Sequence, residues 1–144
     1  MSATTMPVAA APGGRALGRA EWIGFMAMVF GMFMAILDIQ IVAASIADIQ
    51  AGLSASPDEA SWIQTSYLIA EIVMIPLSGF LSRLLSTRVL FTASAAGFTL
   101  FSLLCATATS LPMMIVFRAM QGFIGGAMIP TVFATSFILF QGPR

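Results

Sequence analysis

The chain has 144 residues, of which 59% are hydrophobic and only 8% are charged, and its formal net charge is zero. A soluble domain has about 25% charged residues, because a small globule needs a polar surface, so this composition excludes an ordinary soluble protein and favours a chain surrounded by lipid. All six basic residues are arginine and histidine is absent, which excludes a histidine metal site, and the charge balance indicates no nucleic-acid partner.

The first 21 residues form a segment of small residues, rich in Ala, Pro, Gly and Thr. Such a composition cannot build a core, so we expect residues 1–21 to be a disordered tail. A secretory signal peptide is excluded, because the apolar segment that follows is longer than the roughly 7–15 residues of a signal core.

Four long apolar segments follow the tail, at residues 22–47, 61–81, 89–108 and 111–137. Each reaches or exceeds the roughly 20 residues that a helix needs to cross a bilayer. Strands of a membrane barrel are about half as long and alternate apolar with polar residues. The sequence therefore predicts an all-α integral membrane protein with four transmembrane helices.

The arginines predict the orientation of these spans. Arg15 and Arg19 precede the first span, Arg83 and Arg88 lie between the second and third, and Arg144 follows the fourth. The segment between the first and second spans carries acidic residues and no basic one. Since cytoplasmic loops carry an excess of Lys and Arg, we expect both termini and the loop around Arg83 and Arg88 to be cytoplasmic.

Three ionisable residues interrupt the apolar segments: Asp38, Glu71 and Arg118. Such side chains cost at least about 2.5–3.5 kcal/mol in lipid, so they normally face a cavity or a partner. At 1.5 Å per residue, Asp38 and Arg118 lie about 13 Å and about 10 Å below the same end. The pair, with Glu71 as a second acid, has two readings: a proton-coupling cluster in a polar cavity, or a structural ion pair.

The fourth segment has a distinctive sequence around its arginine, RAMQGFIGG at residues 118–126. Helical spacing places one group on a single face: Arg118, Gln121, Gly122 and Gly125. Gly122 and Gly126 form a pair of small residues that lets another helix approach closely. Pro130 should bend the helix and free carbonyls in the preceding turn.

The distribution of charge predicts which spans line a cavity. The first, second and fourth spans carry the acids and the base, so we expect them to surround a polar cavity, whereas the uncharged third span should face lipid. Cys105, the only cysteine, is interpreted as a small apolar filler. No nucleophile–base pair, metal cluster or phosphate-binding loop is present in the sequence, so we expect no catalytic residue, metal or cofactor.

These residues resemble the major facilitator superfamily. The motif at residues 118–126 is similar to the fourth-helix motif R-x-x-Q-G-x-x-x-A/G of that family. Leu37 with Asp38, the sequence SWIQTSY at residues 61–67 and IPLSGFL at residues 75–81 resemble the EmrB/QacA-type fourteen-span drug:proton antiporters. The resemblance covers residues 22–144.

Two departures from the family pattern limit what the resemblance implies. The loop after the second span normally reads G-x-x-x-D-R-x-G-R-R, whereas here Gly79 is followed by Arg83 at the acidic position and by Arg88. The usual gate in this cytoplasmic loop therefore does not transfer. In the first span, Gln40 and Ala43 replace the family's usual Thr and Asn, so no substrate role transfers to them.

The resemblance implies the first four spans of a bacterial inner-membrane permease that exports small organic molecules against proton entry. It implies that Arg118 supports proton coupling and that Asp38 lines the path, with a periplasmic adaptor and an outer-membrane channel as partners. Residues 141–144 (QGPR) are interpreted as a truncation in a cytoplasmic loop. An exporter of an ordinary metabolite and a non-transporting membrane scaffold or assembly subunit stay open as alternatives.

Overall fold

The computed structural model describes residues 18–141, and every regular element in that range is a helix: α1 (Arg19–Ala44), α2 (Ile46–Leu53), α3 (Pro57–Leu84), α4 (Thr87–Ala106), α5 (Leu111–Gly125) and α6 (Met128–Gln141). Four spans are long and apolar enough to cross a membrane: α1, α3, α4, and α5 with α6 taken together. The predicted all-α membrane fold is thus confirmed. Most of the tail expected to be disordered, and the residues after 141, lie outside the described range.

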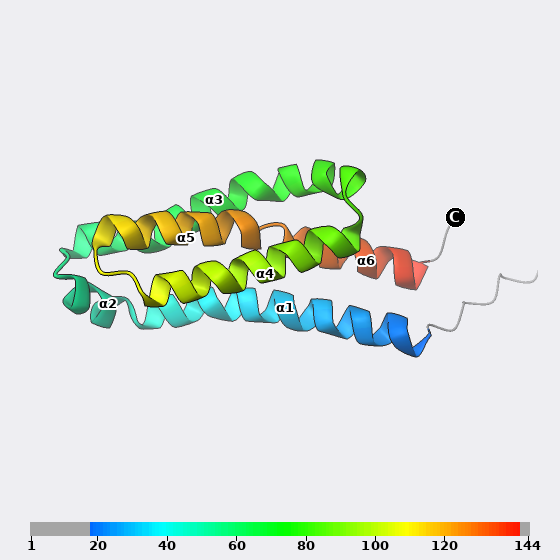
Figure 1. Cartoon of the computed structure of the whole chain (residues 1–144), viewed down its shortest axis with the longest axis horizontal. Coiled ribbons are helices and arrows are strands. Elements are labelled where there is room, and N and C mark those ends of the chain that lie inside the picture. The colour runs from blue at the N-terminus through cyan, green and yellow to red at the C-terminus, as the bar shows by residue number, and fades with distance from the viewer. Residues whose placement is uncertain (1–17, 142–144) are drawn as a thin grey trace, which may run out of the picture.

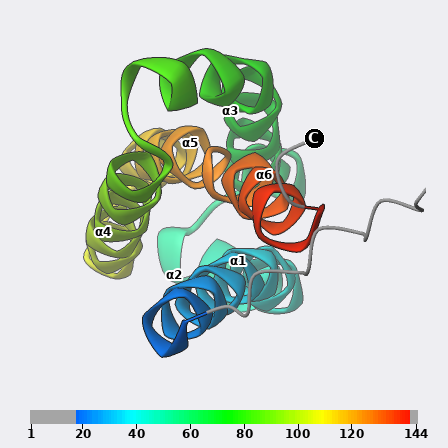
Figure 2. The same ribbon diagram turned by 90° about the vertical axis from the view of Figure 1, so that its right-hand side faces the viewer.

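The spans run side by side, and successive spans alternate in direction (Figure 1). The start of α1, the α3–α4 link and the end of α6 lie at one end of the bundle, whereas α2 and the α4–α5 link lie at the other. Viewed along the bundle, α5 and α6 lie between α1, α3 and α4 (Figure 2). The most extensive contact is between α3 and α5, followed by α4 with α5, so the fourth span is the centre of the described bundle.

The outward surfaces of the bundle carry large apolar side chains. Ile23, Phe30 and Ile72 are 69%, 61% and 66% exposed, and they are three of many. An apolar surface of this extent would be unfavourable in water and is what a helix presents to lipid. The interior is small and has two clusters of buried residues, one of Met74, Leu90 and Ala127 and a larger one taken from four helices: Ala35, Tyr67, Phe98 and Met128. We call these four residues the central cluster.

The second span is longer than predicted at both ends, Pro57–Leu84 instead of 61–81. At its start the Ser56 hydroxyl accepts from the Glu59 N–H (3.3 Å), and the Glu59 carboxylate accepts from the Ser56 N–H (2.9 Å). Pro57 occupies the first helical position, where its fixed φ is favourable. This capping box satisfies N–H groups that have no partner inside the helix, so the helix starts before the apolar segment does.

The first span differs from its predicted bounds of 22–47. It begins at Arg19, because the Gly18 N–H donates to the Glu21 carboxylate (3.0 Å) and so caps the first turn. It ends at Ala44, because Ser45 leaves the helical region with φ −98° and ψ 7°. The chain then forms the short helix α2 at the end of the bundle.

The fourth span is broken where Pro130 predicts a bend. Proline has no N–H to donate to the Gly126 carbonyl, four residues earlier. The Gly126 N–H still donates to Gly122 (2.8 Å), but the Ala127 N–H turns to Ile124, three residues back, at 3.4 Å. The expected single helix 111–137 is therefore two helices, α5 and α6, joined by a tight turn.

The predicted cytoplasmic loop around Gly79, Arg83 and Arg88 is not a loop in the structure. Gly79 and Arg83 lie in the last turns of α3, Arg88 lies in the first turn of α4, and only Leu85 and Ser86 link the two helices. The helix continues this far because its backbone hydrogen bonds persist, the last from the Leu85 N–H to Leu81 (2.7 Å).

Candidate functional site

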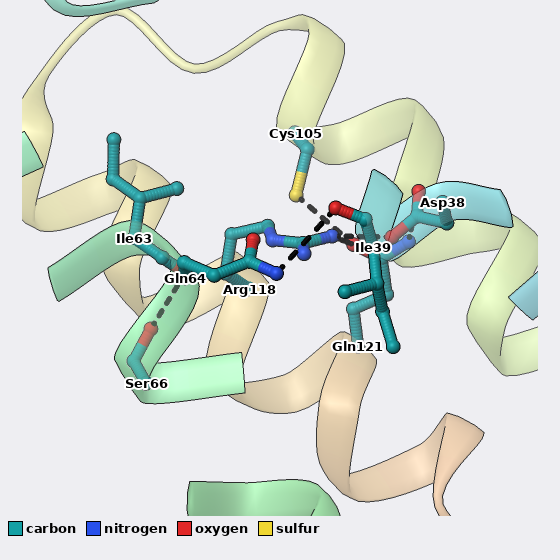
Figure 3. A network of polar contacts seen from close by, with 8 residues as sticks. All are labelled: Asp38, Ile39, Ile63, Gln64, Ser66, Cys105, Arg118 and Gln121. Atoms are coloured by element: carbon teal, nitrogen blue, oxygen red, sulfur yellow. Dashed lines mark hydrogen bonds and ion pairs between the residues drawn. The ribbon is translucent and has the colours of Figure 1, made fainter. Parts of the chain in front are cut away.

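Three polar side chains meet in the interior between α1 and α5 (Figure 3). The Arg118 Nη1 atom donates to Asp38 Oδ2 at 2.6 Å and to Gln121 Oε1 at 2.8 Å. The Gln121 amide in turn donates to Asp38 Oδ1 at 3.3 Å. Each of the three groups contacts the other two, so the carboxylate, the guanidinium and the amide form one closed unit, which we call the polar triangle.

The members of the polar triangle differ in burial. The Arg118 side chain is 1% exposed, whereas the Asp38 side chain is 19% exposed. The structure therefore places the positive charge in the interior and leaves part of the acid accessible. Ionised hydrogen-bond partners at 2.6–2.9 Å form strong bonds, and such pairing is what makes a buried guanidinium tolerable.

The aromatic ring of Tyr67 lies against the Arg118 guanidinium. The distance from Cζ to the ring centroid is 4.2 Å, within the range of a cation–π contact. Tyr67 is fully buried on α3 and belongs to the central cluster. The remaining guanidinium nitrogens, Nε and Nη2, and the Tyr67 hydroxyl are buried without a hydrogen-bond partner within residues 18–141.

The glycines of α5 explain why α3 can come so close. A Cβ atom on Gly122 would collide with the backbone carbonyl of Tyr67, and one on Gly126 would lie 2.9 Å from the carbonyl oxygen of Glu71. Tyr67 and Glu71 are one turn apart on α3, so the two glycines form a strip against which the α3 backbone packs. The predicted close approach is present, and α3 is the helix that makes it.

Glu71, predicted to lie close to Asp38 and Arg118 as a second acid, is buried at 8% exposure. In the described part of the chain its side chain has no hydrogen bond or ion pair, so the structure does not join it to the polar triangle. It is on the same face of α3 as Ile63, Tyr67 and Met74. The packing of α3 against the glycine strip therefore explains why Glu71 is buried.

Sequence reasoning missed several neighbours of the polar triangle. Cys105 of α4, taken as a filler, has its Sγ atom 3.6 Å from Gln121 Oε1. Gln64 of α3 donates to the Ile39 carbonyl at 3.4 Å. The sequence carries a signal for Gln64, because Gln64, Tyr67 and Glu71 follow i, i+3 and i+7 in the second span and so share one face.

A cavity in the described part of the chain lies elsewhere. It has a volume of about 650 Å³ and lies between α1, α4 and α6, with Glu21, Arg88, Phe91 and Leu139 among its lining residues. The sequence predicts a polar cavity between the first, second and fourth spans, whereas this cavity lies between the first, third and fourth spans. The uncharged third span also buries a face, Leu90 with Ser94 and Phe98, so it does not face only lipid.

The polar triangle joins a carboxylate to a guanidinium, and a guanidinium keeps its charge at any working pH. The described residues thus place one partly accessible acid beside one buried, permanent cation.

Comparison with known proteins gives a consistent result. The model of the Major Facilitator Superfamily matches residues 28–141. The Colistin resistance protein EmrB of Acinetobacter baumannii is 56% identical over 126 residues, which cover 88% of this chain and 25% of that protein. The Fatty acid resistance protein FarB of Neisseria gonorrhoeae is 39% identical, over 73% of this chain and 21% of that protein. The Multidrug export protein EmrB of Escherichia coli is 34% identical, over 73% and 20%.

The chain thus spans about a quarter or less of the length of these curated relatives. No solved structure matches it.

Proposed function

Because the chain belongs to the Major Facilitator Superfamily, we propose that it forms the first four spans of a proton-coupled exporter of small organic molecules. Below, "the parent transporter" means the full-length polypeptide that contains residues 1–144. The relatives are named for colistin resistance, fatty acid resistance and multidrug export, which supports an exporter rather than an enzyme or a scaffold. In this proposal the protein lies in a bacterial inner membrane with its N-terminus in the cytoplasm.

The observation that carries the proposal is the Asp38–Arg118 pair at 2.6 Å. In the coupling step, a proton binds to a carboxylate oxygen of Asp38 and the ion pair with Nη1 becomes a neutral–cation contact. Release of that proton to the other side restores the pair. Arg118 supplies a charge that does not change, so each cycle alters the charge of the site by one unit at one residue.

In this proposal Glu71, the second acid, supports the Asp38–Arg118 pair from α3. Glu71 lies one turn beyond Tyr67 on the face of α3 that packs against α5.

A periplasmic adaptor and an outer-membrane channel complete the proposed export path in a cell with two membranes. An adaptor would meet the end of the bundle that carries α2.

Substitution of the pair in the parent transporter tests the proposal. Arg118→Gln should abolish proton-driven efflux in membrane vesicles while expression stays near normal, and Arg118→Lys should retain part of the efflux, because it keeps the charge but loses the planar donor geometry. Arg19→Gln is the matched control, since Arg19 is exposed at the first position of α1, and it should leave efflux unchanged.

The competing reading is a purely structural ion pair. It expects Arg118→Gln to destabilise the detergent-purified protein by as much as about 3–5 kcal/mol, because a partly buried carboxylate is left unpaired. It also expects that adding Asp38→Asn restores both stability and transport. Full efflux by Arg118→Gln would refute the proposed coupling, and restored efflux in the double variant would support the structural reading.

A further inference from the structure

The hydrogen bonds of the polar triangle hold the Arg118 guanidinium at only one corner. Both of its side-chain hydrogen bonds, to Asp38 and to Gln121, use Nη1. Nε and Nη2 are buried and have no partner among residues 18–141. The two N–H groups of Nη1 anchor that corner, so the rest of the group depends on a contact other than a hydrogen bond.

The Tyr67 ring supplies that contact. It lies under the guanidinium at 4.2 Å from Cζ, and the negative face of an aromatic ring attracts a cation most strongly where water is excluded. Arg118 and Tyr67 are 1% and 0% exposed, so this contact is desolvated on both sides. The Tyr67 hydroxyl has no partner in the described structure, so the ring face is what Arg118 uses.

Tyr67 is itself held in place by the glycine strip and the central cluster. Its backbone carbonyl lies where a Cβ of Gly122 would be, and its hydroxyl is 3.6 Å from the position that a Cβ of Gly125 would take. Ala35, Phe98 and Met128 surround it from three other helices. The ring therefore cannot move away from the guanidinium without displacing the α3–α5 contact.

From this geometry we propose that Tyr67 is a positioning residue, which holds the Arg118 guanidinium in place whether or not Asp38 carries a proton. The inference rests on the proposed coupling function. When Asp38 binds a proton, Nη1 loses its anionic partner, whereas the attraction of the ring for the cation is unchanged. The groups that titrate or carry charge around Arg118 are Asp38 on α1, Tyr67 and Glu71 on α3, and Cys105 on α4.

A series of substitutions at Tyr67 in the parent transporter separates the ring face from the hydroxyl and from simple packing. Tyr67→Phe keeps the ring and should retain efflux. Tyr67→Leu removes it and should reduce efflux roughly 3- to 30-fold, the rate equivalent of one desolvated cation–π contact. Phenylalanines at position 67 with increasing fluorination weaken the negative ring face at nearly constant shape, and should lower efflux stepwise.

Leu90→Ala is the matched control. Leu90 is buried on α4 but belongs to a separate cluster with Met74 and Ala127, away from the Tyr67 ring. This variant should lose thermal stability in detergent about as much as Tyr67→Leu, yet keep its efflux. Equal loss of efflux in the two variants, or fluorination without effect, would reduce Tyr67 to a packing residue and overturn the inference.

A spectroscopic readout decides the question without transport. In the parent transporter labelled with ¹⁵N-arginine, the Arg118 Nε–H signal is assigned by its absence in Arg118→Gln. Wild type, Tyr67→Phe and Asp38→Asn should show a ring-shifted, slowly rotating guanidinium, whereas Tyr67→Leu combined with Asp38→Asn should show a freely rotating one. A restricted guanidinium in that double variant would overturn the inference. Full efflux by Arg118→Gln would refute the proposed function. The spectrum would still show whether Tyr67 restrains the guanidinium, because it does not measure transport.

Discussion

Arg118 is a permanent positive charge with almost no exposure, and its stability depends on a very small number of neighbours. Asp38 supplies the opposite charge, Gln121 bridges the two, and the Tyr67 ring covers one face. Because these contacts meet at one group, removing Asp38 takes away the only anionic hydrogen-bond partner of a buried guanidinium in the described part of the chain. Such a loss typically costs more than the bond itself contributes.

Gln121 gives the clearest test of this interdependence at the level of a single residue. Gln121→Leu keeps the volume but removes the donor to Asp38 and the acceptor for Arg118, so it should destabilise the parent transporter by about 1–3 kcal/mol. Gln40→Leu, an exposed position on α1, should change stability by less than about 0.5 kcal/mol. Thermal unfolding in detergent compares the two, and equal midpoints would show that the bridging amide contributes nothing.

The sequence allowed part of this site to be predicted. Asp38 and Arg118 stand out because charges are rare and costly inside apolar spans, and helical rise places them at similar depth. Tyr67 could not be predicted in the same way, since an aromatic residue in an apolar segment suits lipid, core or site equally. Its role depends on the register of α3 against α5, which no local pattern determines.

Two glycines explain why α3 and α5 can approach each other closely in the described bundle. Gly122 and Gly126 face the α3 backbone, with no side chain that could move aside. In lipid, helices associate through such close packing and not through a hydrophobic driving force. The register that places Tyr67 under Arg118 therefore depends on residues that have no side chain.

Gly122→Ala should consequently be more harmful than an alanine substitution normally is. Its Cβ would collide with the Tyr67 carbonyl, so α3 and α5 would have to separate, and overpacking of this kind costs about 1–3 kcal/mol. Gly24→Ala is the control, because nothing lies within 4 Å of its Cβ position and alanine favours the helix. Stability and efflux are measured for both variants, and an unchanged Gly122→Ala protein would refute the role of the glycine strip.

The observed ends of the helices show which signals in the sequence are sufficient to predict a helix boundary. A bend in the fourth span was predicted, because Pro130 removes a specific hydrogen bond, and the structure divides the span into α5 and α6 one turn before that proline. The break at Ser45 was not predicted, since neither proline nor glycine marks it and the apolar pattern continues past it. Apolar length measures how much of a helix lies in lipid, whereas the caps at Ser56 and Ser86 determine where the helices begin.

At the scale of the whole molecule, the two ends of the bundle differ in charge. Arg19, Arg83 and Arg88 lie in helix ends that share one end of the bundle, and the α2 end carries Asp48 and Asp58. Since the cytoplasmic side attracts basic residues, we expect the arginine end to be cytoplasmic.

Cysteine labelling tests this topology. In a cysteine-free background of the parent transporter, Gly52→Cys in α2 should react with a membrane-impermeant thiol reagent added to spheroplasts. Leu85→Cys, in the α3–α4 link, should react only after the membrane is opened. Gly52 and Leu85 are better labelling positions than the nearby Ser56 and Ser86, because the hydroxyls of these serines cap α3 and α4. The opposite labelling pattern would reverse the proposed orientation.

The pairing of Asp38 with Arg118 across 80 residues has a consequence for how the protein is made. At about 5–20 residues per second, the ribosome adds Arg118 roughly 4–16 s after Asp38. During that interval the first span holds an acid whose partner has not been synthesised, and an unpaired charge in lipid is costly. The ion pair that joins α1 to α5 can therefore form only after the fourth span has been made.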